Sequence, residues 1–111
     1  MSFTAQVKRV YVAGPYSGGD PATNTRKAID AADALLKRGY APYIPHLNHF
    51  WHFVHPHSYE TWIDLDLAYL KRCEAVLRLP GESPGADLEV STAQGRGMFV
   101  GYSMEDFPPR T

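Results

Sequence analysis

Apolar positions along this chain fall into short continuous runs and into longer segments where they recur at helical spacing. Four short runs, rich in β-branched and aromatic residues, predict strands at 8–14 (KRVYVAG), 40–45 (YAPYIP), 75–81 (AVLRLPG) and 98–102 (MFVGY). Helices are predicted at 21–38, at 59–75 and within 85–97. Strands alternating with such helices predict an α/β fold, a three-layer open parallel sheet of four or five strands with helices on both faces. This architecture is flavodoxin-like or Rossmann-like.

The helix predicted at 21–38 has the clearest signals. Its apolar stripe follows the i, i+3, i+4, i+7 spacing and comprises Ala28, Ile29, Ala32, Leu35 and Leu36. Asp20 is expected to cap the helix, with Pro21 at the first helical position and Gly39 as its stop. By contrast, the tail 103–111 (SMEDFPPRT) has no period and is expected to be irregular.

Composition limits the class of protein. A chain of 111 residues, 44% hydrophobic, has enough sequence for one core, which predicts a single domain over 1–111. The net charge of -1, with both signs scattered, argues against polymeric nucleic acid as a partner. No apolar run is long enough for a membrane span or signal peptide, so we expect a soluble cytoplasmic protein without a membrane partner. The lone Cys73 precludes an intrachain disulfide and is expected to be a small core residue.

The loop 14–19 (GPYSGG) follows the first predicted strand, at the sheet edge where open parallel α/β sheets bind ligands. Its glycines would let backbone N–H groups approach a phosphate or a sugar closely. The loop is neither a GxGxxG fingerprint nor a Walker motif. A tight strand-to-helix turn is an equally good interpretation of this loop.

Asp66 is the second candidate. At 100° per residue it falls within the apolar arc of its helix, whereas Asp64 falls on the opposite face. The arc comprises Trp62, Ile63, Tyr69, Leu70 and Cys73. An ionised carboxylate on a buried face is costly, so Asp66 is expected to have a partner, a raised pKa or a water-filled cleft. The alternative is a structural hydrogen bond to a nearby loop.

Glu89 is the third candidate, because it lies close to the start of a helix capped by Ser83 or Asp87. The positive end of the helix dipole favours negative charge there and is expected to keep the carboxyl ionised. An ionised, positioned carboxylate suits covalent attack on a sugar anomeric carbon. Glutamate is also common in first turns of helices, and that fact alone favours an ordinary helix residue.

All five histidines lie in 46–58 (HLNHFWHFVHPHS), which has no clear period and is expected to be a loop that can include a helical turn. Histidine is a typical zinc or nickel ligand, which raises the possibility of a metal-dependent hydrolase. The spacing argues against a metal site, because there is no HExxH and Pro56 would end any helix. An aromatic wall or lid over a base is the preferred interpretation, with a dimer contact as the alternative. The candidate rings are Phe50, Trp51, Tyr59 and Trp62.

Three motifs together resemble the nucleoside 2-deoxyribosyltransferase superfamily, which includes the 2'-deoxynucleoside 5'-monophosphate N-hydrolases. They are VYVAGPYSGG, DLDLAYLKRCEAVLRLPG and SPGADLEVSTAQGRG, and the likeness runs over residues 8 to 101. Its most specific part is the spacing of Ser83, Gly85, Glu89 and Ala93. The resemblance implies an enzyme that needs no cofactor, acts on a nucleoside or nucleotide, and forms a homodimer or a higher homo-oligomer.

The resemblance also implies roles for individual residues. Glu89 would attack C1' of a 2'-deoxynucleoside or its monophosphate, giving a glycosyl ester that is released to water or to another base. Asp66 would hydrogen-bond the substrate and help protonate the departing base, and Tyr16 would line the sugar or base pocket. The residues expected to hold the 5' end are Gly14, Ser17, Gly18, Gly19, Ser83 and Gly85.

Two departures and one rival function accompany these implications. Ser17 stands where the monophosphate hydrolases carry an arginine, and the C-terminal residues that transferases share across a subunit interface have no match in GYSMEDFPPRT. The rival is a non-catalytic nucleotide-binding or sensing module with the same pocket.

Overall fold

A computed structural model of the chain describes residues 8–110 and contains a four-stranded, wholly parallel sheet in the order β2-β1-β3-β4. The strands are β1 (Arg9–Ala13), β2 (Ala41–Tyr43), β3 (Ala75–Arg78) and β4 (Phe99–Gly101). The α-helices are α2 (Pro21–Lys37), α3 (Asn48–Val54), α4 (Tyr59–Leu70) and α5 (Pro84–Gly95), and two 3₁₀ helices are η1 (Pro45–Leu47) and η2 (Met104–Asp106). The predicted α/β fold with a parallel sheet is confirmed.

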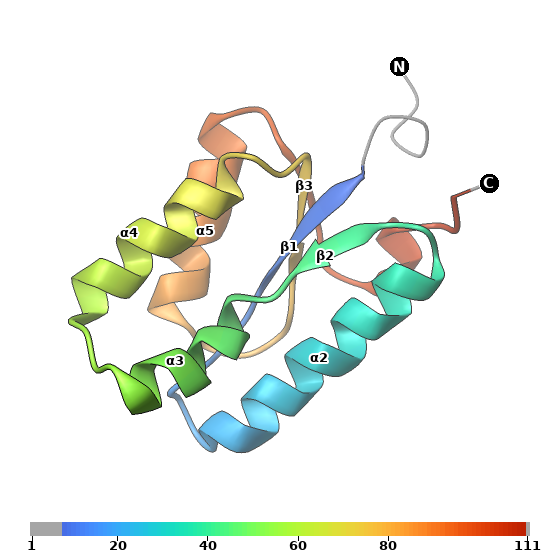
Figure 1. Cartoon of the computed structure of the whole chain (residues 1–111). Coiled ribbons are helices and arrows are strands. Elements are labelled where there is room, and N and C mark those ends of the chain that lie inside the picture. Colours follow the sequence, from blue (N-terminus) through green and yellow to red (C-terminus); the bar gives the residue numbers. More distant parts are fainter. Residues whose placement is uncertain (1–7, 111) are drawn as a thin grey trace.

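The sheet is covered on both faces, α2 on one side and α4 with α5 on the other (Figure 1). Alternate residues of β1 therefore enter different cores. Val10 and Val12 pack with the α2 side, Tyr11 and Ala13 with the α4 and α5 side, and all four are fully buried. A strand buried on both faces must be apolar at every position, which explains the continuous run in the sequence.

Helix α2 begins and ends where its sequence signals lie. The Asp20 side chain accepts a hydrogen bond from Ala22 N at 3.3 Å, and Gly39 adopts φ +95°, a left-handed conformation, just after the helix. The predicted stripe is too wide, because Ala28, Ala32 and Leu35 are buried but Ile29 and Leu36 are exposed.

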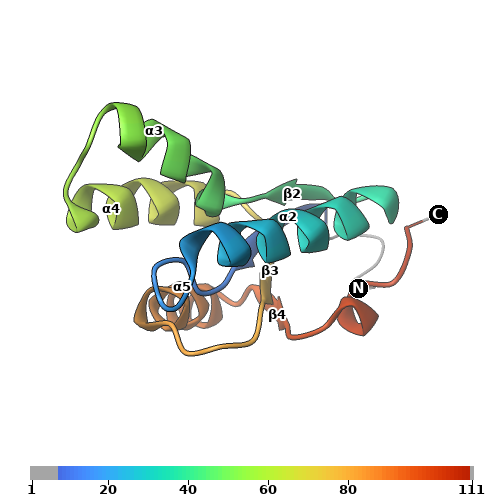
Figure 2. The ribbon, with the colours of Figure 1, turned by 90° about the horizontal axis from the view of Figure 1, so that it is seen from below.

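The expectation of a loop at 46–58 is wrong for most of that stretch. Helices η1 and α3 occupy 45–54, and Figure 2 shows α3 lying over α4. No residue of α3 is buried, and a helix without a buried face needs no apolar stripe. The sequence pattern therefore did not predict this helix. The segment is helical because it packs rings against α4, where Trp51 meets Trp62 edge-on at 5.2 Å.

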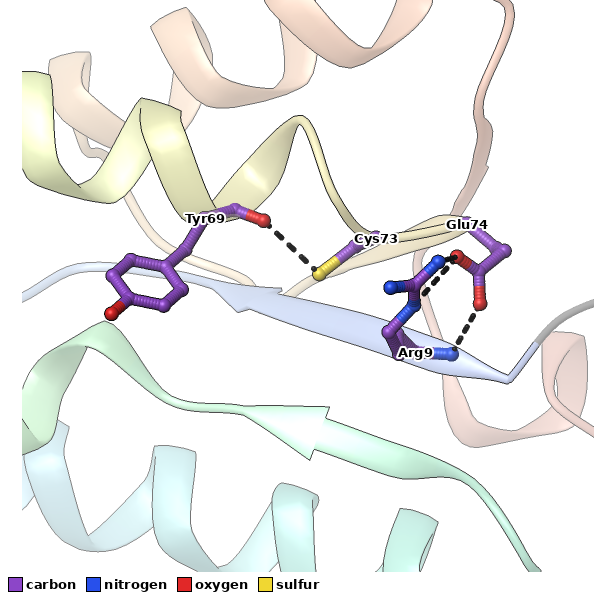
Figure 3. A network of polar contacts seen from close by, with 4 residues as sticks. All are labelled: Arg9, Tyr69, Cys73 and Glu74. Atoms are coloured by element: carbon purple, nitrogen blue, oxygen red, sulfur yellow. Dashed lines mark hydrogen bonds and ion pairs between the residues drawn. The ribbon is translucent and has the colours of Figure 1, made fainter.

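Helix α4 is shorter than predicted, since it ends at Leu70 and the chain turns through 71–74 into β3. Glu74 in this turn fixes β3 to β1, because its carboxylate accepts from Arg9 Nε at 2.9 Å and from the Arg9 backbone N at 2.9 Å (Figure 3). Cys73 is half-buried against the α4 and α5 core, and burial raises the pKa of its thiol to about 11. A thiol so rarely ionised is a packing residue, as predicted.

The carboxyl-terminal tail is ordered rather than irregular, which corrects the prediction for 103–110. Ser103 and Asp106 form a capping box at η2, and Phe107 is fully buried. Arg38 Nη1 donates to the carbonyls of Met104 and Phe107 at 2.7 and 3.0 Å. The tail is held by one buried ring and by these hydrogen bonds. It therefore lacks the periodic apolar pattern from which a helix or strand is predicted. Within residues 8–110, no helix is both long and apolar enough to cross a bilayer.

Candidate active site

A cleft of about 600 Å³ opens beyond the carboxyl ends of β1 and β3. From β1 the chain continues through α2 to β2 on one side, while β3 lies on its other side, so the strand order reverses at this point. Such a switch point leaves a crevice between the loops that leave in opposite directions. The cleft walls come from the loop after β1, from η1 and α3, from α4, and from the start of α5.

The cleft brings together all but one of the nine residues that the sequence predicts to be catalytic or substrate-binding. Those that line it are Gly14, Tyr16, Ser17, Gly18, Asp66, Ser83, Gly85 and Glu89. Gly19 does not line it; this residue adopts φ +80°, in the left-handed region, and completes the turn into α2. The placement of the eight together is a property of the fold, and their chemical roles remain predictions.

Glu89 lies on the second turn of α5 and is 5% exposed. The hydroxyl of Tyr11, which rises from the centre of β1, donates a hydrogen bond to its Oε2. Burial raises the pKa of Glu89 to about 7, the Tyr11 hydrogen bond opposes that rise, and the negative charge of Asp66 adds to it. The expectation that the helix dipole keeps this carboxyl ionised is therefore wrong: desolvation is the larger effect, and Glu89 is near half-ionised at neutral pH.

The start of α5 is fixed by two polar contacts. Ser83, not Asp87, is the N-cap, since its Oγ accepts from Ala86 N at 3.1 Å. Asp87 is exposed and pairs with Arg78 at 3.0 Å, while Arg78 also donates to the carbonyls of Leu79 and Gly81. These bonds hold the loop between β3 and α5, and so they hold the helix that carries Glu89.

Asp66 lies in the same cleft, on α4 beside Trp62 and Ile63, while Asp64 is exposed. Burial raises its pKa to about 6, and a hydrogen bond from Asn48 Nδ2 at 3.3 Å opposes the rise. The inward placement expected from helix geometry is confirmed, and Asp66 has a raised pKa, a partner and a cleft at once. Two carboxyls with raised pKa values in one hollow are an arrangement typical of acid–base sites.

The glycine loop is held tightly against the rest of the site. A Cβ at Gly14 would lie 3.0 Å from Leu79 Cβ, so a larger residue there would push β3's end away. Asn24 Nδ2 donates to the carbonyls of Tyr16 and Gly18 at 2.9 and 2.7 Å. Across the cleft, a Cβ at Gly85 would lie 3.3 Å from the Tyr59 hydroxyl. The small residues therefore keep the opening wide enough for a ligand.

Histidines and aromatic rings form the wall opposite Glu89. Tyr59 and Trp62 line the cleft, whereas Phe50 and Trp51 do not. His52 Nδ1 accepts from Trp62 Nε1 at 2.8 Å, and His49 Nδ1 is hydrogen-bonded to the Tyr16 hydroxyl. Over the described part of the chain, no group of three or more His, Cys, Asp or Glu side chains could hold a metal ion. His49 and His52 thus hold the rings of Tyr16 and Trp62 in place.

Tyr11 and Asn48 are among the residues of this site that sequence reasoning missed. Tyr11 is fully buried in a strand, and a buried tyrosine hydroxyl requires a hydrogen-bond partner, which is the signal that could have identified it. Asn48 reaches Asp66 only because α3 folds back over α4, and the sequence carries no pattern for that contact.

Comparison with known proteins supports the fold and places the chain in a family. The family model described as a domain of unknown function (DUF7768) matches residues 8–103. Among solved structures, the chain is similar to a 2-desoxiribosyltransferase from Leishmania mexicana, with 17% identity and a TM-score of 0.64. The match covers 84% of this chain and 61% of the Leishmania chain, and at this identity it is evidence for a shared fold. Among curated proteins, none matches this sequence.

Proposed function

This chain belongs to the family described as a domain of unknown function, DUF7768, and we propose that it is an N-glycosidic bond enzyme. Its substrate would be a 2'-deoxynucleoside or its 5'-monophosphate, and its intermediate a glycosyl ester of Glu89. The observation that carries this proposal is the buried Glu89 carboxyl, held by Tyr11 in one cleft with Asp66. The likeness to a 2-desoxiribosyltransferase supports the same class of reaction.

In the first step a Glu89 oxygen attacks C1' of the sugar, and the C1'–N bond breaks as the new C–O bond forms. The departing base takes the electron pair of the broken bond together with a proton from Asp66. In the second step a water, or a second base, attacks C1' and releases the Glu89 carboxylate. The proton of that acceptor returns to Asp66, so the site regains its starting state.

This scheme requires one proton on the two carboxyls, with Glu89 ionised and Asp66 protonated. Burial raises both pKa values, to about 7 for Glu89 and about 6 for Asp66, so the two lie close together. A single proton shared by the pair therefore resides more often on Glu89 than on Asp66, and the pair titrates as a unit. The reactive form, with the proton on Asp66, is the less populated of the two singly protonated forms and is reached at small cost.

A substrate panel tests the proposed function directly. The protein is incubated with the four common 2'-deoxynucleosides and with their 5'-monophosphates, and free base is measured by chromatography. Release of base above the rate without protein is the expected result, and transfer is recognised by a new nucleoside when a second base is added. Tight binding without any release would instead support a non-catalytic nucleotide-binding module, and loss of release with a chelator would support a metal-dependent hydrolase.

The Tyr11→Phe variant tests how the nucleophile is held. Removing the hydroxyl leaves Glu89 without the hydrogen bond that opposes its pKa rise, so the acidic limb of the pH–rate profile should move to higher pH. We expect base release near pH 6 to fall roughly tenfold. Tyr69→Phe is the matched control, because Tyr69 is half-exposed, stacks on Tyr43 at 4.9 Å and does not line the cleft. A lower rate at all pH values with an unmoved limb would mean that Tyr11 only supports the fold.

A further inference from the structure

We infer that the cleft selects a nucleoside with an uncharged 5' end over the corresponding 5'-monophosphate, an inference that rests on the proposed function. The described residues that line the cleft include three carboxyls, Asp66, Glu82 and Glu89, and no lysine or arginine. A 5'-phosphate carries nearly two negative charges at neutral pH. Binding it would place those charges among carboxylates without a compensating cation, which costs affinity.

Arg78, a largely buried cation whose charge lowers the pKa of Glu89, is already paired. Arg78, at the end of β3, pairs with Asp87 and donates to the carbonyls of Leu79 and Gly81, and its side chain is 11% exposed. Arg78 does not line the cleft. Turning its guanidinium toward a ligand would break all three contacts and release the loop that leads into α5. Residues 1–7 and 111 contain no lysine or arginine either.

Histidines are the remaining source of positive charge, and two of the four in the wall are engaged with protein partners. His52 Nδ1 accepts hydrogen bonds from Trp62 Nε1 at 2.8 Å and from His57 N at 3.2 Å, so this nitrogen cannot donate to a ligand. Burial lowers the pKa of His46, whose Nε2 donates to the Pro15 carbonyl at 2.9 Å. His52 Nδ1 and His46 Nε2 are therefore not available to a phosphate.

Among the three carboxyl residues of the cleft, Glu82 is the one that lies beside the glycine loop, which is expected to hold the 5' end. Glu82 precedes the N-cap Ser83, and its backbone oxygen is 3.8 Å from where a Cβ at Gly18 would be. The glycine loop and the backbone of Glu82 therefore border the same part of the cleft. The positive end of the α5 dipole is equivalent to about half a charge and is smaller than the opposing carboxylate. Glu82 is thus a specificity-determining residue against phosphate.

The test compares matched pairs that share one base, such as 2'-deoxyadenosine and its 5'-monophosphate. We expect kcat/KM for the nucleoside to exceed that for the monophosphate by roughly tenfold or more at low ionic strength. The difference should shrink when salt is raised from about 0.05 M to about 0.5 M, because an exposed carboxylate is screened. Equal rates, or a preference for the monophosphate, would overturn the inference.

Two variants distinguish a specific effect of the Glu82 carboxylate from the effect of a change in net charge. Glu82→Gln is expected to raise the monophosphate-to-nucleoside ratio of kcat/KM by about threefold, given its exposure. Asp64→Asn removes an equal charge from the outer face of α4 and should keep the wild-type ratio. If both variants behave alike, Glu82 has no part in the selection.

Failure of the proposed function is distinguishable from failure of this inference. If the protein releases base from neither compound of a pair, titration calorimetry with the same two compounds tests the selection by comparing their affinities. Tighter binding of the nucleoside would uphold the selection in a non-catalytic protein. Equal binding, tighter binding of the monophosphate, or no binding of either would overturn it.

Discussion

Glu89→Gln is expected to abolish base release, lowering kcat by roughly a thousandfold or more, because the amide cannot form the glycosyl ester. The substitution is nearly isosteric, and the Tyr11 hydroxyl can still donate to the amide oxygen, so the cleft keeps its shape. Binding of the nucleoside, measured by calorimetry, should persist. Glu60→Gln is the matched control, since Glu60 is exposed in the first turn of α4 and outside the cleft. A Glu89→Gln variant that released base at near the wild-type rate would contradict the covalent scheme.

The same substitution should change stability with a definite dependence on pH. The carboxyl has an ordinary pKa of 4.5 in the unfolded chain and of about 7 in the folded protein. Between these values the folded state binds more protons, so the free energy of unfolding falls as pH rises from 4.5 to 7 and stays low above. Glu89→Gln removes this effect, and we expect a gain on the order of 2 kcal/mol near pH 8 and little change near pH 4. Equal effects at both pH values would mean that the charge of Glu89 costs the fold nothing.

Phe107→Ala is expected to have the largest effect on folding, a loss of about 3–5 kcal/mol in the free energy of unfolding. Phe107 is fully buried, and its ring meets Tyr40 at 5.8 Å and Phe99 at 5.6 Å, both edge-on. A Cβ at Gly101 would lie 2.5 Å from the Phe107 ring, so the ring fills space that the glycine in β4 leaves open. Truncation would leave a cavity against the α2 side of the sheet.

Urea denaturation followed by circular dichroism measures this loss. Phe53→Ala provides the comparison, because Phe53 on α3 is 82% exposed and its loss should change stability by no more than about 0.5 kcal/mol. Phe107 does not line the cleft, so any Phe107→Ala protein that remains folded should release base at the wild-type rate. A change of less than about 1 kcal/mol would mean that the tail detaches without loss to the core.

The sequence was sufficient for the sheet and its main helices, because each of these elements repeats a local pattern. The strand at 9–13 follows from its continuous apolar run, and the helix at 21–37 from its N-cap and stop signals. Helix α3 and the tail were not predictable in this way. Helix α3 buries no residue and so has no stripe, and the tail is held by one ring and by hydrogen bonds from Arg38 and Tyr40, distant in the chain.

The candidate site shows the same division. Asp66 could be placed by helix geometry, and Glu89 by its position near a helix start, since both depend on neighbours in the chain. The ionisation of Glu89 could not be predicted from the sequence, because it depends on burial and on Tyr11, which is 78 residues away in the chain. The helix start, and with it the effect of the helix dipole, can be predicted from the sequence. The desolvation of Glu89 by segments distant in the chain cannot.

Helix α3 contributes Asn48, His49 and His52 to the cleft, yet none of its residues belongs to either core. Lining the cleft and filling the core are thus separate tasks in this segment, so substitutions at 48–54 should alter the cleft wall with little penalty to the sheet. Exchanging residues 48–54 between η1 and α4 is therefore expected to reshape the cleft while both cores stay intact.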